Sequence, residues 1–160
     1  MRLEDKSALS LAQSGQLGEI RFFRYFLSIG NLNSTKIPNA VFVGYQFAEK
    51  FGKLQEIYAT FSKDEKVTLL TGKSKDGYIV NLFFDFTNQT NKPIKQVEIA
   101  GSQGIYQFDT TTENAFQSNF LTTDEEFFYT DASVQEQAFF NQLKENATTN
   151  ELICVKGAKA

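Results

Sequence analysis

The chain has 160 residues, of which 41% are hydrophobic, and its net charge is −3. This length and apolar content fit one domain, residues 1–160, with a core of its own, and they exclude a disordered chain. Because the net charge is negative and the sequence has no basic cluster, nucleic-acid binding is not expected. The absence of His excludes Ser-His-Asp and Cys-His catalysis and His-ligated zinc sites.

In chain order, the sequence begins with a helix and a strand. Apolar residues recur at helical spacing within 4–14, and Gly15 is expected to close this helix in the left-handed conformation. The aromatic-rich stretch 18–28 predicts a strand. After a polar loop, Pro38 suits the first turn of a second helix, which Gly52 ends.

The middle of the chain predicts strands joined by short turns, at 54–62, 66–71, 78–87, 94–100 and 105–109. Gly101 and Gly104 bracket the last of these turns, where positive φ is expected. Another short strand is predicted near 126–129. The capping-box pattern of Ser133 and Glu136 opens the final helix. Its buried side is expected to consist of Ala138, Phe139 and Leu143.

A run of strands with helices gathered at the ends predicts an α+β fold, with an open, mostly antiparallel sheet and helices on one face. In 78–86 the even positions are all apolar, whereas the odd positions are mixed. We therefore expect the even positions to face the helices. The odd face, with Ile79 and Phe83, is expected to contact a partner subunit; the alternative is that a segment of the same chain covers it.

Three stretches resemble, in the same order, parts of one enzyme family. They are the glycine-marked join at 12–20, the Gly-x-x-Gly turn between strands within 97–109, and the near-terminal helix at 135–146. Together they resemble the C-terminal domain of the glucose–fructose oxidoreductase/inositol dehydrogenase (MocA-type) family. The resemblance implies a homo-oligomer, a dimer or tetramer formed through the open sheet face. It also implies that NAD or NADP is held by a separate upstream domain, so we expect no cofactor in this chain.

The family's substrate-side helix carries a His and an Asp that this sequence does not match. Counted back from 51–52, the corresponding residues are Phe42 and Tyr45, which we expect at the edge of a cleft and not in the core. The resemblance therefore implies no catalytic residue. Arg24, Asn39 and Tyr45 are expected to face a ligand; for Arg24 the alternative is an arginine that lies on an apolar surface or pairs at an interface.

The function expected is that of an isolated substrate-binding and oligomerisation domain of an NAD(P)-dependent oxidoreductase, not catalytic by itself. A non-catalytic module that regulates a full-length relative remains an alternative, as does a small-ligand sheet protein unrelated to the family. No carboxylate set suggests a metal site. Because no apolar run reaches the roughly 20 residues of a membrane span, and the lone Cys154 suits a reducing compartment, we expect a cytoplasmic protein without membrane contact.

Overall fold

The computed structural model describes residues 1–90, 92–111 and 127–148. Three helices and six strands follow one another within these ranges. They are α1 (Leu3–Gln13), β1 (Ile20–Ser28), α2 (Ile37–Glu49), β2 (Leu54–Phe61), β3 (Val67–Ser74), β4 (Ile79–Asp85), β5 (Ile94–Gly101), β6 (Ile105–Asp109) and α4 (Val134–Thr148). The expected α+β class is confirmed.

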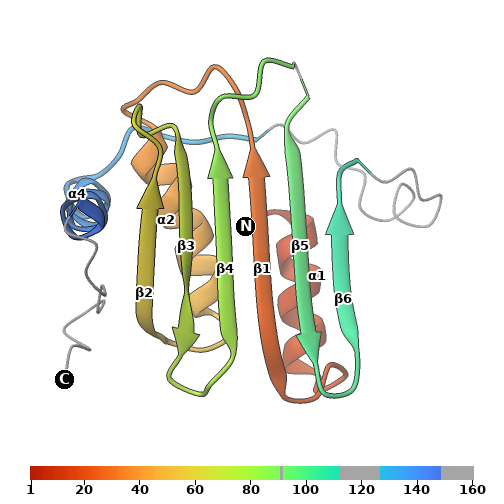
Figure 1. Cartoon of the computed structure of the whole chain (residues 1–160). Helices are drawn as coiled ribbons and strands as arrows, with labels where there is room; N and C mark the ends of the chain where they lie inside the picture. Colours follow the sequence, from red (N-terminus) through yellow and green to blue (C-terminus); the bar gives the residue numbers. More distant parts are fainter. Residues whose placement is uncertain (91, 112–126, 149–160) are drawn as a thin grey trace.

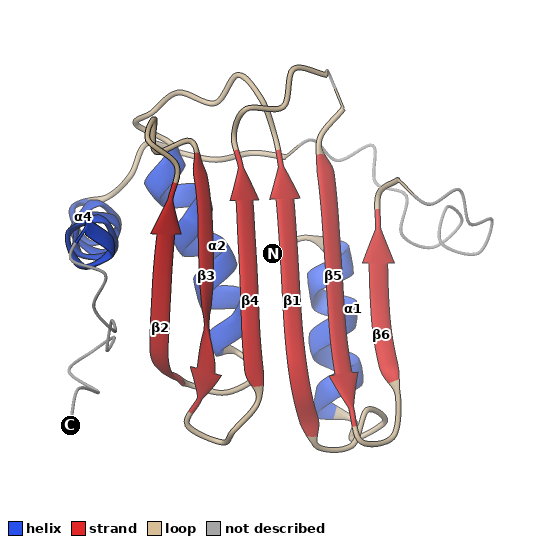
Figure 2. Cartoon of the chain, viewed as in Figure 1, coloured by secondary structure: helices blue, strands red, loops and turns tan. Residues whose placement is uncertain are grey.

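The six strands form one sheet in the order β2-β3-β4-β1-β5-β6, so the first strand of the chain lies in the middle (Figure 1). β1 and β4 pair in parallel, and every other neighbouring pair is antiparallel. A parallel pair requires a crossover, which α2 and the β2–β3 hairpin supply. Helices α1 and α2 lie behind the sheet, and α4 lies beside the β2 edge (Figure 2). The other face, which we call the open sheet face, carries no helix of the described residues.

Side chains of the central strands alternate between the two faces, as the sequence predicts. In β4, Val80, Leu82 and Phe84 are buried beneath the helices, whereas Ile79 is 59% exposed and Phe83 is half-buried on the open sheet face. β1 alternates in the same way, with its odd positions buried from 23 to 27. The helix side of the sheet is therefore the core, and the open sheet face keeps apolar side chains in contact with solvent.

Helix α2 contacts the sheet through a glycine, Gly44. A Cβ at Gly44 would lie 2.7 Å from the Phe84 ring and 3.1 Å from the Tyr25 ring, so a larger residue would push the helix away. The Tyr78 hydroxyl lies 2.7 Å from the Ala48 carbonyl and 2.8 Å from the Gly52 carbonyl at the end of α2. These contacts fix α2 over β4 and β1.

Aromatic rings fill much of this core. Phe47 of α2 packs edge-on against Phe23 of β1, with ring centroids 5.5 Å apart. Of the six tyrosines in the sequence, five are buried and only Tyr58 is largely exposed. The buried tyrosines are Tyr25, Tyr45, Tyr78, Tyr106 and Tyr129.

The predicted capping box at the start of α4 is confirmed, and both of its reciprocal hydrogen bonds are present. The Ser133 backbone N–H donates to Glu136 Oε1 at 2.8 Å, and the Glu136 backbone N–H donates to Ser133 Oγ at 3.1 Å. The expected buried side is partly wrong, because Ala138 is exposed while Phe140 and Leu143 are buried.

Two further expectations fail for local reasons. Gly15 does close α1 with a φ of +81°, but positive φ is found at Gly18 and not at Gly101 or Gly104. Position 101 requires a glycine for a steric reason, because a Cβ there would lie only 2.0 Å from the Leu17 carbonyl oxygen. The strand expected near 126–129 is absent at 127–129, where the chain is irregular, and residue 126 lies outside the described ranges.

Candidate functional site

The residues expected to face a ligand do not come together in one place. Arg24 lies on the open sheet face, where its Nη1 donates to Gln96 Oε1 at 3.2 Å and its guanidinium lies 5.9 Å from the Phe26 ring centroid. Asn39 and Tyr45 belong to α2, on the opposite side of the sheet. Arg24 therefore cannot share a pocket with the other two residues.

Asn39 connects α2 to the segment that leads into α4. Its side-chain amide donates to Glu136 Oε2 at 2.9 Å, and its side-chain oxygen accepts from the Thr130 backbone N–H at 3.0 Å. Both ends of the amide are thus engaged within the chain. The side chain acts as a bridge between two elements that are far apart in sequence.

Phe42 and Tyr45 belong to the core between α2 and α4. Tyr45 is only 1% exposed, and its ring lies 4.6 Å from that of Phe139, while the Phe42 ring lies 5.4 Å from it. Burial raises the pKa of the Tyr45 phenol, and the nearby Glu49 carboxylate raises it further. The expectation that Phe42 and Tyr45 lie at the edge of a cleft is wrong, because α4 covers this side of α2.

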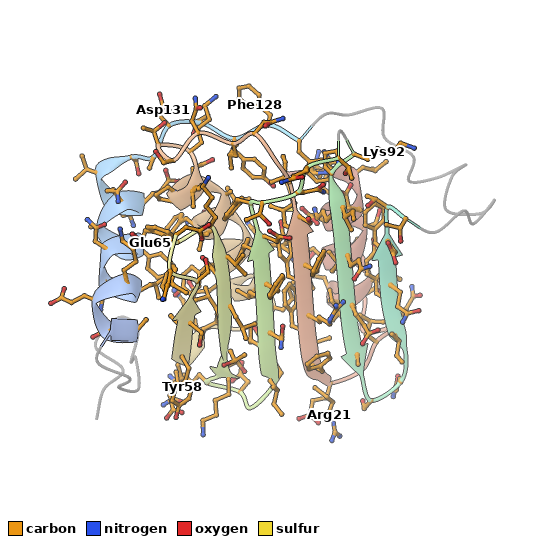
Figure 3. All side chains as sticks on the ribbon, turned by 45° about the horizontal axis from the view of Figure 1, so that its top comes forward. Arg21, Tyr58, Glu65, Lys92, Phe128 and Asp131 are labelled. Carbon is orange, nitrogen blue, oxygen red and sulfur yellow. The ribbon has the colours of Figure 1, made fainter. Side chains whose placement is uncertain are left out.

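A cavity of about 540 Å³ opens instead between α1 and α2, on the helix side of the sheet. Its walls are aromatic and consist of Tyr25, Phe47, Phe127 and Tyr129. Exposed apolar side chains surround its mouth, namely Met1, Val43 and Phe128. Its polar lining consists of Arg2, Asp5, Gln46, Lys50 and Lys95. Figure 3 shows Phe128 at the outer edge of the molecule, on the segment that precedes α4.

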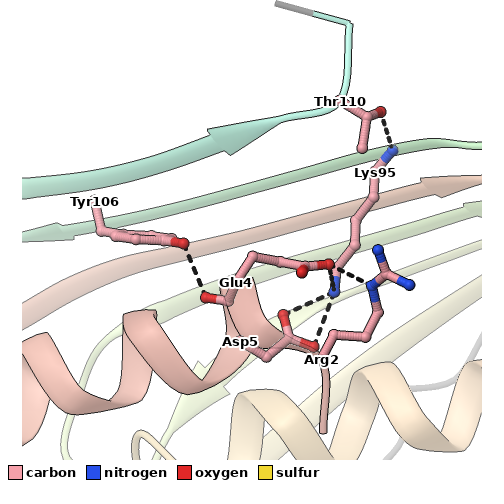
Figure 4. Close-up of polar contacts among 6 residues, drawn as sticks. All are labelled: Arg2, Glu4, Asp5, Lys95, Tyr106 and Thr110. Carbon is pink, nitrogen blue, oxygen red and sulfur yellow. Dashed lines mark hydrogen bonds and ion pairs between the residues drawn. The ribbon is translucent and has the colours of Figure 1, made fainter. Parts of the chain in front are cut away.

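Three of the lining residues, Arg2, Asp5 and Lys95, belong to a network of buried charges. Figure 4 shows this network. Lys95 is 1% exposed, and its Nζ donates to both carboxylate oxygens of Asp5 at 2.7 and 2.8 Å and to Glu4 Oε1 at 3.1 Å. Arg2 also pairs with Glu4. The Tyr106 hydroxyl donates to the Glu4 backbone carbonyl at 2.8 Å. The first turn of α1 is thus attached to β5 and β6.

The two carboxylates of the network respond differently to their surroundings. Burial would raise the pKa of Glu4, but the Lys95 charge and the Arg2 hydrogen bond outweigh it and hold this pKa below its usual value. For Asp5, burial prevails over the attraction of Lys95, and the pKa is raised. Two positive and two negative side chains make the network neutral when all four groups are ionised.

The two tyrosines in the cavity wall are neutral hydrogen-bonding groups. Burial raises the pKa of the Tyr25 phenol well above its usual value, and the neighbouring Tyr129 raises it further. Burial also raises the pKa of Tyr129. Both hydroxyls therefore keep their protons at neutral pH and remain able to donate.

The described residues contain no group of three or more His, Cys, Asp or Glu side chains that could hold a metal ion. Lys95 Nζ pairs with both Asp5 oxygens and with Glu4 Oε1, whereas the buried Glu4 Oε2 has no hydrogen-bond partner among the described residues. None of the helices in the described ranges has the length and apolar character that a bilayer crossing requires.

The sequence does not predict the cavity and its buried charges, although it contains one signal of them. Lys95 occupies a position in its strand that alternates with the buried Val97 and Ile99, so period-two alternation places a lysine in the core. A buried lysine requires carboxylate partners. Acidic residues are common in the first turn of a helix, so the sequence alone does not show that Glu4 and Asp5 pair with Lys95.

The residues expected on the oligomer face lie together on the open sheet face. Phe83 stacks on Phe26 of β1 with ring centroids 5.3 Å apart and planes 6° from parallel. Three exposed apolar side chains share this face, namely Tyr58 of β2, Ile79 of β4 and Ile105 of β6.

No sequence profile of a known protein family matches the chain, and no curated protein matches it. Solved structures with a similar fold do exist. The WlbA dehydrogenase of Bordetella pertussis, in complex with NADH and UDP-GlcNAcA, is 10% identical with a TM-score of 0.70; the match covers 96% of this chain and 60% of that one. An oxidoreductase of Thermotoga maritima is 15% identical with a TM-score of 0.69, over 96% of this chain and 61% of that one.

A scyllo-inositol dehydrogenase of Lactobacillus casei, with NAD(H) and scyllo-inositol bound, is 15% identical with a TM-score of 0.59 over 90% of this chain. The present chain spans 52% of the length of that protein. At such low identities the likeness is one of fold. The fold implied by the sequence resemblance is confirmed: nearly the whole chain has the architecture of about half of an inositol-dehydrogenase-type oxidoreductase.

Proposed function

We propose that this chain is a substrate-binding and oligomerisation domain of a MocA-type, NAD(P)-dependent oxidoreductase and that it carries out no redox reaction by itself. The observation that carries the proposal is the fold match, which covers 90 to 96% of this chain but only 52 to 61% of the dehydrogenases. The sequence has no Gly-x-Gly-x-x-Gly fingerprint and no His. These features support a binding and assembly role.

The open sheet face supports the oligomerisation part of the proposal. It presents the stacked pair of Phe26 and Phe83 beside the exposed Ile79, and the described residues place no helix over it. An apolar sheet face of this kind is stabilised when a second copy covers it. A dimer built sheet to sheet, or two such dimers, satisfies this requirement.

Two measurements test the proposal. Light scattering at micromolar concentration should give a mass that is a multiple of 18.1 kDa. Calorimetric titration with NAD and NADP should give no isotherm, since the phosphate-binding unit is missing from the sequence. A monomer would contradict the assembly role, and a micromolar dinucleotide isotherm would contradict the non-catalytic role.

A further inference from the structure

The cavity between α1 and α2 combines an apolar mouth with aromatic walls. Val43 and Phe128 at the mouth are 41% and 81% exposed, although both are large apolar side chains. Phe47 and Phe127 line the wall behind them, and the Arg2 guanidinium lies 3.9 Å from the Phe127 ring centroid. The volume of about 540 Å³ lies within the roughly 300–1,000 Å³ of small-molecule sites. Such a lining suits a flat apolar body.

The charged side chains around the cavity leave one positive charge in excess. Arg2 and Lys95 are matched by Glu4 and Asp5 in the buried network. Lys50, the C-cap residue of α2, is exposed and lines the cavity, and it makes no ion pair within the described part of the chain. The cavity therefore presents a cation to solvent in a protein whose net charge is −3.

We propose that this cavity binds an amphipathic organic anion, a small molecule with an aromatic or similar apolar body and one acidic group. The apolar body packs between Phe47 and Phe127, with Val43 at its edge, and the acidic group pairs with Lys50. The Asp5 carboxylate does not repel this ligand, because both of its oxygens accept hydrogen bonds from Lys95. The inference rests on the ligand-binding part of the proposed function and is independent of the oligomer.

A matched pair of fluorescent probes tests both parts of the recognition. The anion 8-anilino-1-naphthalenesulfonate and its uncharged parent N-phenyl-1-naphthylamine share one apolar body and differ by the sulfonate. We expect saturable binding of the sulfonate at one site per chain. Its affinity should exceed that of the parent by roughly threefold or more at low salt and should fall as the salt concentration rises.

Two substitutions, each with a matched control, locate the site. Lys50→Glu should weaken sulfonate binding by roughly three- to tenfold and leave the parent unchanged, whereas Lys53→Glu, at an exposed lysine outside the cavity, should change neither. Val43→Trp adds bulk at the mouth and should weaken both probes. Ile79→Trp, on the open sheet face, should weaken neither. Thermal unfolding of each variant verifies that the fold is retained.

Several results would overturn the inference. They are equal effects of Lys50→Glu and Lys53→Glu, no effect of Val43→Trp, a loss of binding in Ile79→Trp, or no saturable binding of the sulfonate. Failure of the oligomerisation role would appear as a monomer by light scattering, and failure of the non-catalytic role as a dinucleotide isotherm. Neither readout involves these probes, so the failures are distinguishable.

Discussion

The ammonium of Lys95 lies 2.7 Å from one carboxylate oxygen of Asp5, and this contact joins β5 to the first turn of α1 across 90 residues of sequence. Both side chains are buried, as is the neighbouring Glu4. Loss of any one charge leaves the others without compensation in a poorly solvated place. The attachment of α1 to the sheet therefore depends on this group of charges as a unit.

We predict that Lys95→Met lowers the free energy of unfolding by about 3–5 kcal/mol, because it leaves two buried carboxylates with only Arg2 as a positive neighbour. Urea unfolding measures this loss. The control Lys92→Met, at an exposed lysine of the same region, should change stability by less than about 0.5 kcal/mol. Combining Lys95→Met with Asp5→Asn should cost less than the sum of the single changes. If the losses of the two single variants simply add, the Lys95–Asp5 contact contributes nothing to stability.

The stability of the protein should depend on pH through Glu4. The folded pKa of Glu4 is below the usual 4.5, so its contribution is present above pH 4.5 and is lost as the pH falls through the folded pKa. We predict that the stability difference between wild type and Glu4→Gln, measured in urea, shrinks from pH 6 to pH 3.

The contribution of Asp5 to stability should change with pH in the opposite direction to that of Glu4. Burial raises its pKa, so its contribution is present below the usual value of 3.8 and is lost as the pH rises through the folded pKa. The stability of wild type relative to Asp5→Asn should therefore increase as the pH falls. Parallel pH profiles for the two variants would contradict this assignment.

The double variant Phe42→His with Tyr45→Asp should be strongly destabilised. Both side chains pack on Phe139 in the α2–α4 contact, and the changes remove buried aromatic surface and introduce polar groups there. We expect a loss of about 3–5 kcal/mol or more. Gln46→Asp, at an exposed position of the same helix, should be nearly neutral. Thermal unfolding measures the loss. An unchanged midpoint for the double variant would show that α4 does not pack on this side of α2.

Neighbouring phenylalanines of β4 should give different results when replaced by Glu. Phe83→Glu places a charge on the open sheet face, so we expect a folded protein with a shift toward monomer in light scattering. Phe84→Glu buries a charge in the core beneath α2 and should unfold the chain. A Phe83→Glu protein with the wild-type mass would place the interface elsewhere.

Local patterns predicted the elements of the fold well. The alternation in β4 indicated which face the helices cover, and the Ser133–Glu136 capping box marked the start of α4. Each of these features is determined by neighbours within a few residues, and such neighbours are visible in the sequence.

The partners of helix α2 could not be predicted in this way. Ten of its 13 residues are buried, so its pattern has no clear polar side that would show which face meets the sheet and which meets α4. The sequence therefore predicts a cleft at Phe42 and Tyr45, on the side of α2 that α4 covers in the structure. The contact of Lys95 with Asp5 is equally remote in sequence, and the close approach of Gly101 to Leu17 depends on how two turns meet.

The burial of five of the six tyrosines has a consequence for the behaviour of the protein in alkali. Burial raises the pKa of Tyr25, Tyr45, Tyr78, Tyr106 and Tyr129 above the usual value of 10.0. Above pH 10 the unfolded chain ionises first and gains stability relative to the fold. Since the protein has no tryptophan, the ultraviolet absorbance of tyrosinate is free of an indole background, and it reports these five phenols together with the exposed Tyr58. Because burial holds the five phenols protonated in the folded state, we expect them to ionise in one cooperative step, together with the opening of the core.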